Sequence, residues 1–294
     1  MKMDKFKILI LATVVFTFMS CDEQTPPGLD LGGQVLAEDS VFLAPVEIPQ
    51  PRAVMMEELT GAGCSNCPEA ASIIEGLINA NPGRLYAAAL HPPKSGFTEP
   101  IFEKSVYNFR TPKADDIALY LGDIPSMPSA ATNRIHDAST VYFRSKANWS
   151  GIINDALSKQ TPVNIHLTSS YDSEDNICTV TAQVAFTQDV PDDVNLTIYV
   201  TENDVIDYQL DGNNYVPDYE FDHIFRDCIT NIQGNPLNLG GKTAGTVMQK
   251  RFEFQPIITG DNAWVVDNCN IIAFVNKVEG VDKEILHTAE VHMK

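Results

Sequence analysis

Basic residues are scarce in this sequence. Its 294 residues contain 20 Lys and Arg against 39 Asp and Glu, which gives a formal net charge of −19 at pH 7. No cluster of basic residues offsets this excess anywhere along the chain. Because a strongly acidic surface repels phosphate groups, nucleic acid and anionic lipid headgroups are excluded as expected partners.

The sequence also lacks the common patterns of metal and cofactor sites. Its six His are scattered without ligand spacing, and it has no phosphate-binding loop, zinc ribbon or Ser/His/Asp set. We expect His91, at the end of an apolar run, to be a capping or surface residue. The segment from Asp207 to Asp218 matches a calcium loop only in part, with Gln at the third position and Asp at the twelfth. We interpret it as part of a long acidic connection over residues 203–222, and we expect no metal and no cofactor.

Only one long hydrophobic run occurs, from Ile8 to Met19. It follows three Lys and is shorter than the roughly 20 residues of a membrane-spanning helix, so it fits the core of a signal peptide over residues 1–20. The run ends in Ser20-Cys21, which resembles the lipobox of bacterial lipoproteins. We therefore expect Cys21 to be lipidated and to become the N-terminus, the alternative being a stray cysteine beside an ordinary cleavage site.

Residues 21–51 are rich in Pro, Gly, Asp and Glu and show no sustained period, which predicts a flexible tether. Asp22 and Glu23 resemble the surface-export signal of lipoproteins in Bacteroidota, whereas an Asp at this place resembles an inner-membrane retention signal in enterobacteria. No later apolar segment is long enough to span a bilayer. We expect an exported lipoprotein that its lipid holds in the outer membrane, facing either the periplasm or the cell surface.

The most informative segment runs from Val54 to Leu77, where an apolar run leads into Cys64-Ser-Asn-Cys67 and an amphipathic helix. Two cysteines three residues apart on the first turn of a helix are close enough to form a disulfide. The N-terminal end of the helix also stabilises a thiolate at Cys64. The pattern predicts a thiol–disulfide site, or else a structural disulfide between strand and helix in an oxidising compartment.

The elements expected around these cysteines resemble those of the thioredoxin fold. Apolar patterns predict strands over residues 85–90, 129–133 and 141–144, and helices over residues 114–121 and from about Asn148. The resemblance implies a cis-proline ahead of the strand that faces the cysteines, where it docks extended substrate. Pro128 matches this place better than Pro125. We therefore expect an α/β thioredoxin-like domain over residues 52–160.

From Pro162 onward, apolar residues alternate with mostly polar ones, as in strands with one buried face. These apolar positions are Ile165, Leu167, Cys178, Val180, Ala182, Val184, Phe186, Leu196, Ile198, Val200, Phe252, Phe254, Ile271, Ala273, Val275 and Ile285. Six or seven such strands predict an all-β immunoglobulin-like sandwich over residues 161–294.

Three further cysteines lie in this second region, so at most one disulfide can form among them. Cys178 lies on the apolar face of its predicted strand, so we expect it to be a buried free thiol. Cys228 and Cys269 are then the first pair to test for a disulfide, the alternative being that all three are small buried side chains.

Together these motifs resemble the Omp-twenty-eight-related family of outer-membrane lipoproteins of Bacteroidota. The matching segments are Glu57-Glu58-Leu-Thr-Gly61 before Cys64-x-x-Cys67-Pro68, the Pro128 strand ending in Asn133-Arg134, the Trp149 helix, Val205-Ile-Asp-Tyr-Gln209, His223-Ile-Phe-Arg226 and Ile272-Ala-Phe-Val275. The resemblance covers nearly the whole mature chain. It implies a lipidated thioredoxin-like domain followed by an immunoglobulin-like sandwich.

Two functions fit these observations. In the first, the protein is a thiol–disulfide oxidoreductase: the Cys64 thiolate attacks a disulfide of an exported protein, Cys67 resolves the mixed disulfide, and Pro128 positions the substrate backbone. In the second, it is a surface binding or adhesion protein whose sandwich binds a protein partner and whose Cys64–Cys67 disulfide is structural. The sequence specifies neither the partner nor the oligomeric state.

Overall fold

The computed structural model describes residues 35–36, 39–238 and 241–294. About 40% of the structure is in strands and 16% in helices, so the protein is mostly β. The described residues form three α-helices: α1 (Cys67–Ala80), α2 (Pro112–Tyr120) and α3 (Trp149–Leu157). None of the helices within these ranges is long and apolar enough to cross a membrane. The expected signal peptide and Cys21 lie outside the described residues.

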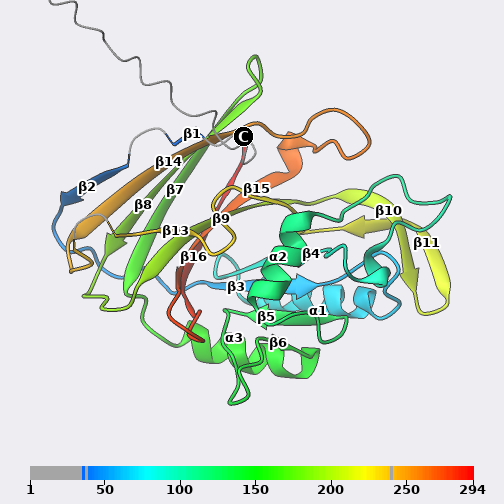
Figure 1. Cartoon of the computed structure of the whole chain (residues 1–294), viewed down its shortest axis with the longest axis horizontal. Helices are drawn as coiled ribbons and strands as arrows, with labels where there is room; N and C mark the ends of the chain where they lie inside the picture. Colours follow the sequence, from blue (N-terminus) through cyan, green and yellow to red (C-terminus); the bar gives the residue numbers. More distant parts are fainter. Residues whose placement is uncertain (1–34, 37–38, 239–240) are drawn as a thin grey trace, which may run out of the picture. The chain divides into compact units, whose positions relative to one another are not determined.

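The strands and three short 3₁₀ helices complete the structure (Figure 1). The strands are β1 (Val35–Leu36), β2 (Ser40–Leu43), β3 (Val54–Leu59), β4 (Leu85–Leu90), β5 (Ser129–Thr132), β6 (Phe143–Arg144), β7 (Val163–Asp172), β8 (Ile177–Phe186), β9 (Val194–Glu202), β10 (Val205–Asp211), β11 (Asn214–Phe221), β12 (Ile224–Cys228), β13 (Asn235–Pro236), β14 (Thr246–Phe254), β15 (Cys269–Lys277) and β16 (Ile285–His292). The 3₁₀ helices are η1 (Gly96–Thr98), η2 (Lys146–Asn148) and η3 (Val266–Asn268).

Nine of these strands form one continuous sheet. Its order is β16-β15-β9-β12-β4-β3-β5-β6, and β13 pairs with β9. Strand β3 runs parallel to β4, with Val54 opposite Leu85, and antiparallel to β5, with Leu59 opposite Ser129. All six residues of β3 are buried, as expected for a strand that is covered on both faces.

Helices cover both faces of the central strands. On one face, α2 packs Ile117 against the core cluster that contains Met55 and Leu59. On the other face, α1 and α3 contribute to a cluster with Val54 and Met56. Figure 1 shows α2 on one side of β3 and α1 on the other. Because side chains alternate along a strand, Glu58 shares the α1 face of β3 with Val54 and Met56.

A second sheet has the order β1-β14-β8-β7, with β2 paired to β14. Its apolar face packs against β9 and β15. The core between them contains most of the positions that the sequence alternation predicted, namely Ile165, Cys178, Val180, Ala182, Val184, Phe186, Leu196, Ile198, Val200, Phe252, Phe254, Ile271, Ala273 and Val275. Leu167 is partly buried against this core, whereas Ile285 belongs to the cluster beneath α2.

The predicted fold class, an α/β thioredoxin-like domain followed by a separate immunoglobulin-like sandwich, is wrong. Strands from both predicted regions join in the nine-stranded sheet, because β12 pairs with β4 on one side and with β9 on the other. Strand β9 is buried on both faces: Ile198 faces the second sheet, and Tyr199 faces the cluster beneath α2. The described residues all belong to one compact unit, so the boundary between residues 160 and 161 stays a prediction about separate folding.

A buried ion pair connects the two parts of this sheet. Arg134 donates to both carboxylate oxygens of Glu57, at 2.9 and 2.8 Å, and neither side chain is exposed. The Tyr199 hydroxyl on β9 donates to Glu57 at 2.7 Å and accepts from Arg134 at 3.0 Å. Strands β3 and β9, which are not neighbours in the sheet, are therefore linked by one network of charged hydrogen bonds.

Candidate functional site

Cys64 and Cys67 form a disulfide, with their Cα atoms 5.4 Å apart. Both residues are buried, with 3% and 2% of their surface exposed. The sequence placed Cys64 on the first turn of the helix, but α1 begins at Cys67, and Cys64 lies in the turn before it. The Cys67 N–H donates to the Cys64 carbonyl at 3.0 Å, and the Cys64 N–H donates to the Gly61 carbonyl at 3.0 Å. We call residues 61–67 the cysteine turn.

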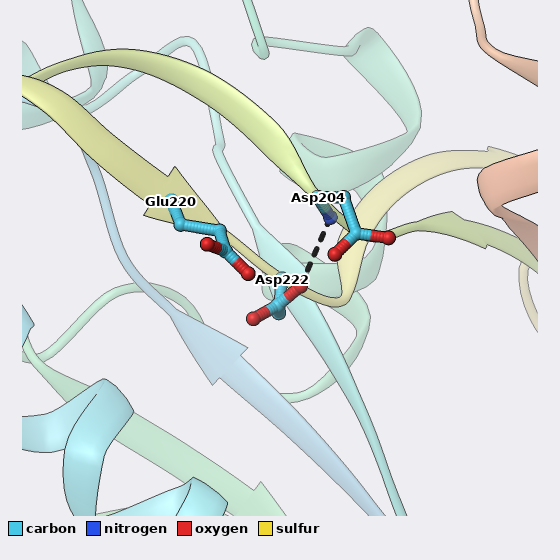
Figure 2. Close-up of side chains that lie close together, drawn as sticks. All are labelled: Asp204, Glu220 and Asp222. Carbon is cyan, nitrogen blue, oxygen red and sulfur yellow. Dashed lines mark hydrogen bonds between the residues drawn. The ribbon is translucent and has the colours of Figure 1, made fainter.

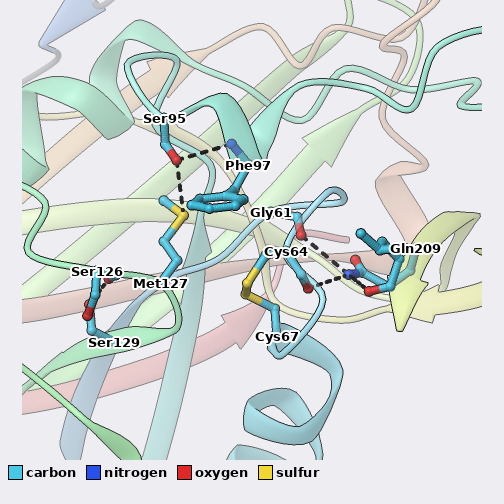
Figure 3. Close-up of a disulfide and its surroundings, with 10 residues drawn as sticks. Gly61, Cys64, Cys67, Ser95, Phe97, Ser126, Met127, Ser129 and Gln209 are labelled. Atoms are coloured by element: carbon cyan, nitrogen blue, oxygen red, sulfur yellow. Dashed lines mark hydrogen bonds between the residues drawn. A yellow bond between two sulfur atoms is a disulfide. The ribbon is translucent and has the colours of Figure 1, made fainter. Parts of the chain in front are cut away.

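Glycines in the cysteine turn permit close contact with the segment at η1. A Cβ atom on Gly61 would lie 2.3 Å from the Phe97 carbonyl oxygen, which is closer than any real contact. The Gly63 N–H donates to the same carbonyl at 2.9 Å. Figure 3 shows Phe97 and Met127 beside the disulfide, with the Met127 sulfur accepting a hydrogen bond from Ser95 at 3.3 Å. The two glycines therefore serve to bring two backbone segments together.

The hairpin of β10 and β11 covers the cysteine turn from the second half of the chain. Gln209 donates from its side-chain amide to the Cys64 carbonyl at 3.1 Å (Figure 3). The backbone N–H groups of Leu210 and Gly212 donate to the carbonyls of Ala62 and Ser65, at 2.8 and 2.9 Å. The interpretation of residues 203–222 as a long acidic connection is therefore wrong, because they form the paired strands β10 and β11. This hairpin reaches the predicted thiol–disulfide site and helps to bury it.

Pro128 lies at the start of β5, whose first residue, Ser129, pairs with Leu59 of β3. The Met127–Pro128 peptide bond is cis, in agreement with the choice of Pro128 over Pro125. The role of Pro128 in docking substrate remains a proposal.

A cavity of about 390 Å³ lies between α1, β3, β4 and the β10–β11 hairpin. Cys67, Glu58 and His91 all line it. Glu58 and His91 are only 4% and 1% exposed, and the Glu58 Oε1 and His91 Nε2 atoms have no hydrogen-bond partner. Burial raises the pKa of Glu58 to about 8 and lowers the pKa of His91 to about 4. Both groups are therefore uncharged near neutral pH in the buried site.

Three carboxylates lie close together at the ends of the hairpin, and two of them, Glu220 and Asp222, also line this cavity. Figure 2 shows Asp204, Glu220 and Asp222, whose carboxylate oxygens lie within 4.8 Å of one another. Asp207, the first residue of the calcium-like pattern, instead accepts backbone hydrogen bonds from Val106 and Tyr107, at 3.0 and 2.8 Å. Its carboxylate holds a loop in place, as expected for a structural residue.

The predicted Cys228–Cys269 disulfide is absent: Cys178, Cys228 and Cys269 are all free and buried. The pairing fails because Cys228 belongs to the cluster beneath α2, whereas Cys269 belongs to the core on the other face of the sheet. Cys178 is a buried free thiol, as predicted. Burial raises the pKa of all three thiols, which makes them poor nucleophiles.

Sequence reasoning missed the roles of Glu58, His91 and Gln209. A signal for Glu58 was present, since two Glu interrupt the otherwise apolar run Val54–Leu59. A charged residue within a buried strand needs either a partner or a function. Glu57 has a partner in Arg134, and Glu58 has none for its Oε1 atom. No local pattern could have shown that Gln209 contacts the cysteine turn.

Three solved structures similar to this chain come from two bacteria. HBP35 of Porphyromonas gingivalis is 19% identical, with a TM-score of 0.62, over 83% of this chain and 76% of that chain. An Agrobacterium tumefaciens protein is 15% identical, with a TM-score of 0.51, over 83% and 96%. A domain of the outer membrane lipoprotein Omp28 from P. gingivalis is 18% identical, with a TM-score of 0.30, over 46% and 89%. These likenesses concern the fold alone.

The search of curated proteins found no match. The model of the family described as outer membrane protein Omp28 matches residues 121–290, which is more than half of the chain. This match confirms the resemblance that the sequence motifs indicated. The chain therefore belongs to the Omp28 family of outer membrane proteins.

Proposed function

We propose that this member of the Omp28 family exchanges thiols and disulfides with exported proteins through Cys64 and Cys67. The observation that supports it most is the cavity that Cys67 shares with Glu58. Glu58 is a buried carboxyl group without a partner for Oε1, and its pKa of about 8 lets it give or take a proton near neutral pH. A purely structural disulfide requires no such group beside it.

The exchange begins when a thiolate of a reduced substrate attacks Cys64 Sγ. The Cys64–Cys67 bond breaks, and Cys67 leaves as a thiolate that takes a proton from Glu58. A second substrate thiolate attacks the substrate sulfur of the mixed disulfide and releases Cys64 as a thiolate. Two electrons pass from the substrate dithiol to the protein, and the reverse sequence reduces a substrate disulfide. In this proposal Pro128, next to the strand pair β3–β5, positions the substrate backbone.

A second candidate is a surface binding protein whose disulfide is structural. The burial of both cysteines and the three hydrogen bonds from the hairpin favour it, since the disulfide is covered on that side. The reduction potential separates the two candidates. A value between about −270 and −120 mV would support exchange, and a value below about −300 mV would support a structural bond.

Alkylation and substitution provide a second test of the exchange proposal. In the reduced protein, Cys64 should be labelled at pH 6 well before Cys67, whereas equal and slow labelling would contradict exchange. Cys64→Ser should abolish exchange, and Cys67→Ser should accumulate mixed disulfides. Glu58→Gln should slow the release of Cys67, while Glu174→Gln, at an exposed turn, is the matched control.

The finer location of the protein is also part of the proposal. Lipidation of Cys21 after removal of residues 1–20 would hold the protein in the outer membrane. The tether predicted over residues 21–51 is wrong for its later part, because β1 and β2 pair with β14. Cys21→Ala should release the protein into the soluble fraction. Retention of this variant on membranes in high salt would contradict lipid anchoring.

A further inference from the structure

The cavity beside Cys67 is strongly acidic. Glu58, Glu75, Asp218, Glu220 and Asp222 line it, and its lining contains neither Lys nor Arg. His223 forms a hydrogen bond with Glu75 at 2.7 Å. The other four carboxyl groups have no Lys or Arg in the cavity lining with which to form an ion pair. An excess of acidic groups in one cavity disfavours anionic ligands and attracts cations. We call this space the acidic cavity.

Two buried polar atoms in the acidic cavity lack hydrogen-bond partners. The His91 Nδ1 atom lies 3.2 Å from the Ala89 carbonyl, which can only accept, so Nδ1 carries the proton and Nε2 is an acceptor. Neither His91 Nε2 nor Glu58 Oε1 has a partner, although both side chains are more than nine-tenths buried. Leaving such atoms unpaired is costly, so the site favours a ligand that brings N–H donors.

Much of the remaining wall of the acidic cavity is apolar or aromatic. Ala71 and Ile74 come from α1, and Tyr219 and Phe221 come from β11. Aromatic faces attract ammonium and guanidinium groups, and the apolar walls fit an aliphatic stem. A volume of about 390 Å³ far exceeds that of a bare metal ion and is in the range of small-molecule sites.

We propose that the acidic cavity binds a small organic cation, with an ammonium or guanidinium head at Glu58 and His91 and an aliphatic stem along α1. The hairpin acids Glu220 and Asp222 supply further negative charge at the same cavity. This binding does not depend on thiol exchange, because the disulfide stays intact and no electrons are transferred.

The test is isothermal titration of the full chain, with its disulfide oxidised, using agmatine, hexylammonium, 1-hexanol and calcium as separate probes. Agmatine and hexylammonium should bind and 1-hexanol should not. Glu58 is uncharged in the empty cavity and would ionise when a cation binds beside it. Glu58→Gln removes that carboxylate and should weaken binding by about 10- to 100-fold. Glu174→Gln removes an equal charge at an exposed turn outside the cavity and should leave affinity unchanged.

A second variant tests the space without altering charge. Ala71→Leu should fill part of the cavity and weaken hexylammonium binding, with circular dichroism confirming the fold. The proposal is overturned if neither cation binds, if Glu58→Gln binds as well as the wild type, or if 1-hexanol binds equally. Binding of calcium in place of both amines would also overturn it and would indicate a metal site at the hairpin acids.

Discussion

The buried ion pair between Glu57 and Arg134 should dominate the response of this fold to single substitutions. Glu57→Gln keeps the shape of the side chain but removes its charge, so Arg134 is left as an uncompensated charge in a site with no exposed surface. Removal of one partner from a buried pair costs about 3–5 kcal/mol. Because small proteins are stabilised by only about 5–15 kcal/mol in total, this variant should lose a large fraction of its stability.

Two further variants determine where that energy comes from. Tyr199→Phe removes only the hydroxyl that bonds to both charged partners and should cost about 1.5–3 kcal/mol. The double variant Glu57→Leu with Arg134→Met replaces both charges by apolar groups and should recover most of the loss from Glu57→Gln. The control is Glu253→Gln, at a half-exposed pair with Arg251, which should cost no more than about 1 kcal/mol.

Urea unfolding, followed by fluorescence and by circular dichroism, measures these free energies. The reasoning would be refuted if Glu57→Gln cost less than about 1 kcal/mol, since water would then have to reach Arg134 in the folded protein. It would also fail if the double variant were less stable than Glu57→Gln, since the pair would then be worth more than apolar packing.

Three other predictions follow from the burial and the close contacts of the site. The pKa of Glu58 is about 8 when folded and about 4.5 when unfolded, so the unfolded chain binds fewer protons between these values. Because of Glu58, the free energy of unfolding should decrease by about 3 kcal/mol from pH 5 to pH 8. Urea titrations at both pH values should show that Glu58→Gln removes this decrease. Gly61→Ala should destabilise the fold, because its Cβ would collide with the Phe97 carbonyl. In contrast, the new Cβ of Gly76→Ala on α1 meets nothing within 4 Å, so this variant should stabilise the fold by about 0.5–1 kcal/mol. Thermal melts that rank these two variants in the opposite order would contradict the close contact at Gly61. A fragment of residues 52–160 lacks β9 and β12, so Glu57 loses Tyr199, and β4 keeps β3 but loses its neighbour on the other side. Contrary to the domain boundary predicted from the sequence, we expect this fragment to remain unfolded by circular dichroism; a cooperative melt would instead support a boundary at residue 160.

Local patterns predicted many of the elements but not their assembly, and they missed β1, β2 and the β10–β11 hairpin, whose residues were expected to form a tether and an acidic connection. Alternation identified the core face of β8 from Cys178 to Phe186, because one face of that strand is solvated and the period is visible. For β9, alternation predicted only one of the two buried faces, because Tyr199 is as buried as Ile198. The pairing of Ile224 with Ala89 joins segments far apart in the sequence, and nothing local to either strand specifies it.

The candidate site followed the same rule. The two cysteines and Pro128 were predictable, since their spacing and order belong to one short region. The groups that enclose them were not, because Gln209 comes from a hairpin 145 residues away and Glu58 becomes unusual only once its strand is buried on both faces. The failed Cys228–Cys269 pair has the same origin, since the two strands present these residues to opposite faces.

The cover that the hairpin places over the cysteine turn has a consequence for the order of events during synthesis. Gln209 is made 145 residues after Cys64. At about 5–20 residues per second, the cysteines exist for on the order of ten seconds before the hairpin that buries them has been made. During that interval both thiols are open to any oxidant that the chain meets. Docking of the hairpin then covers one side of the cysteine turn, so the pair is more accessible before this step than after it.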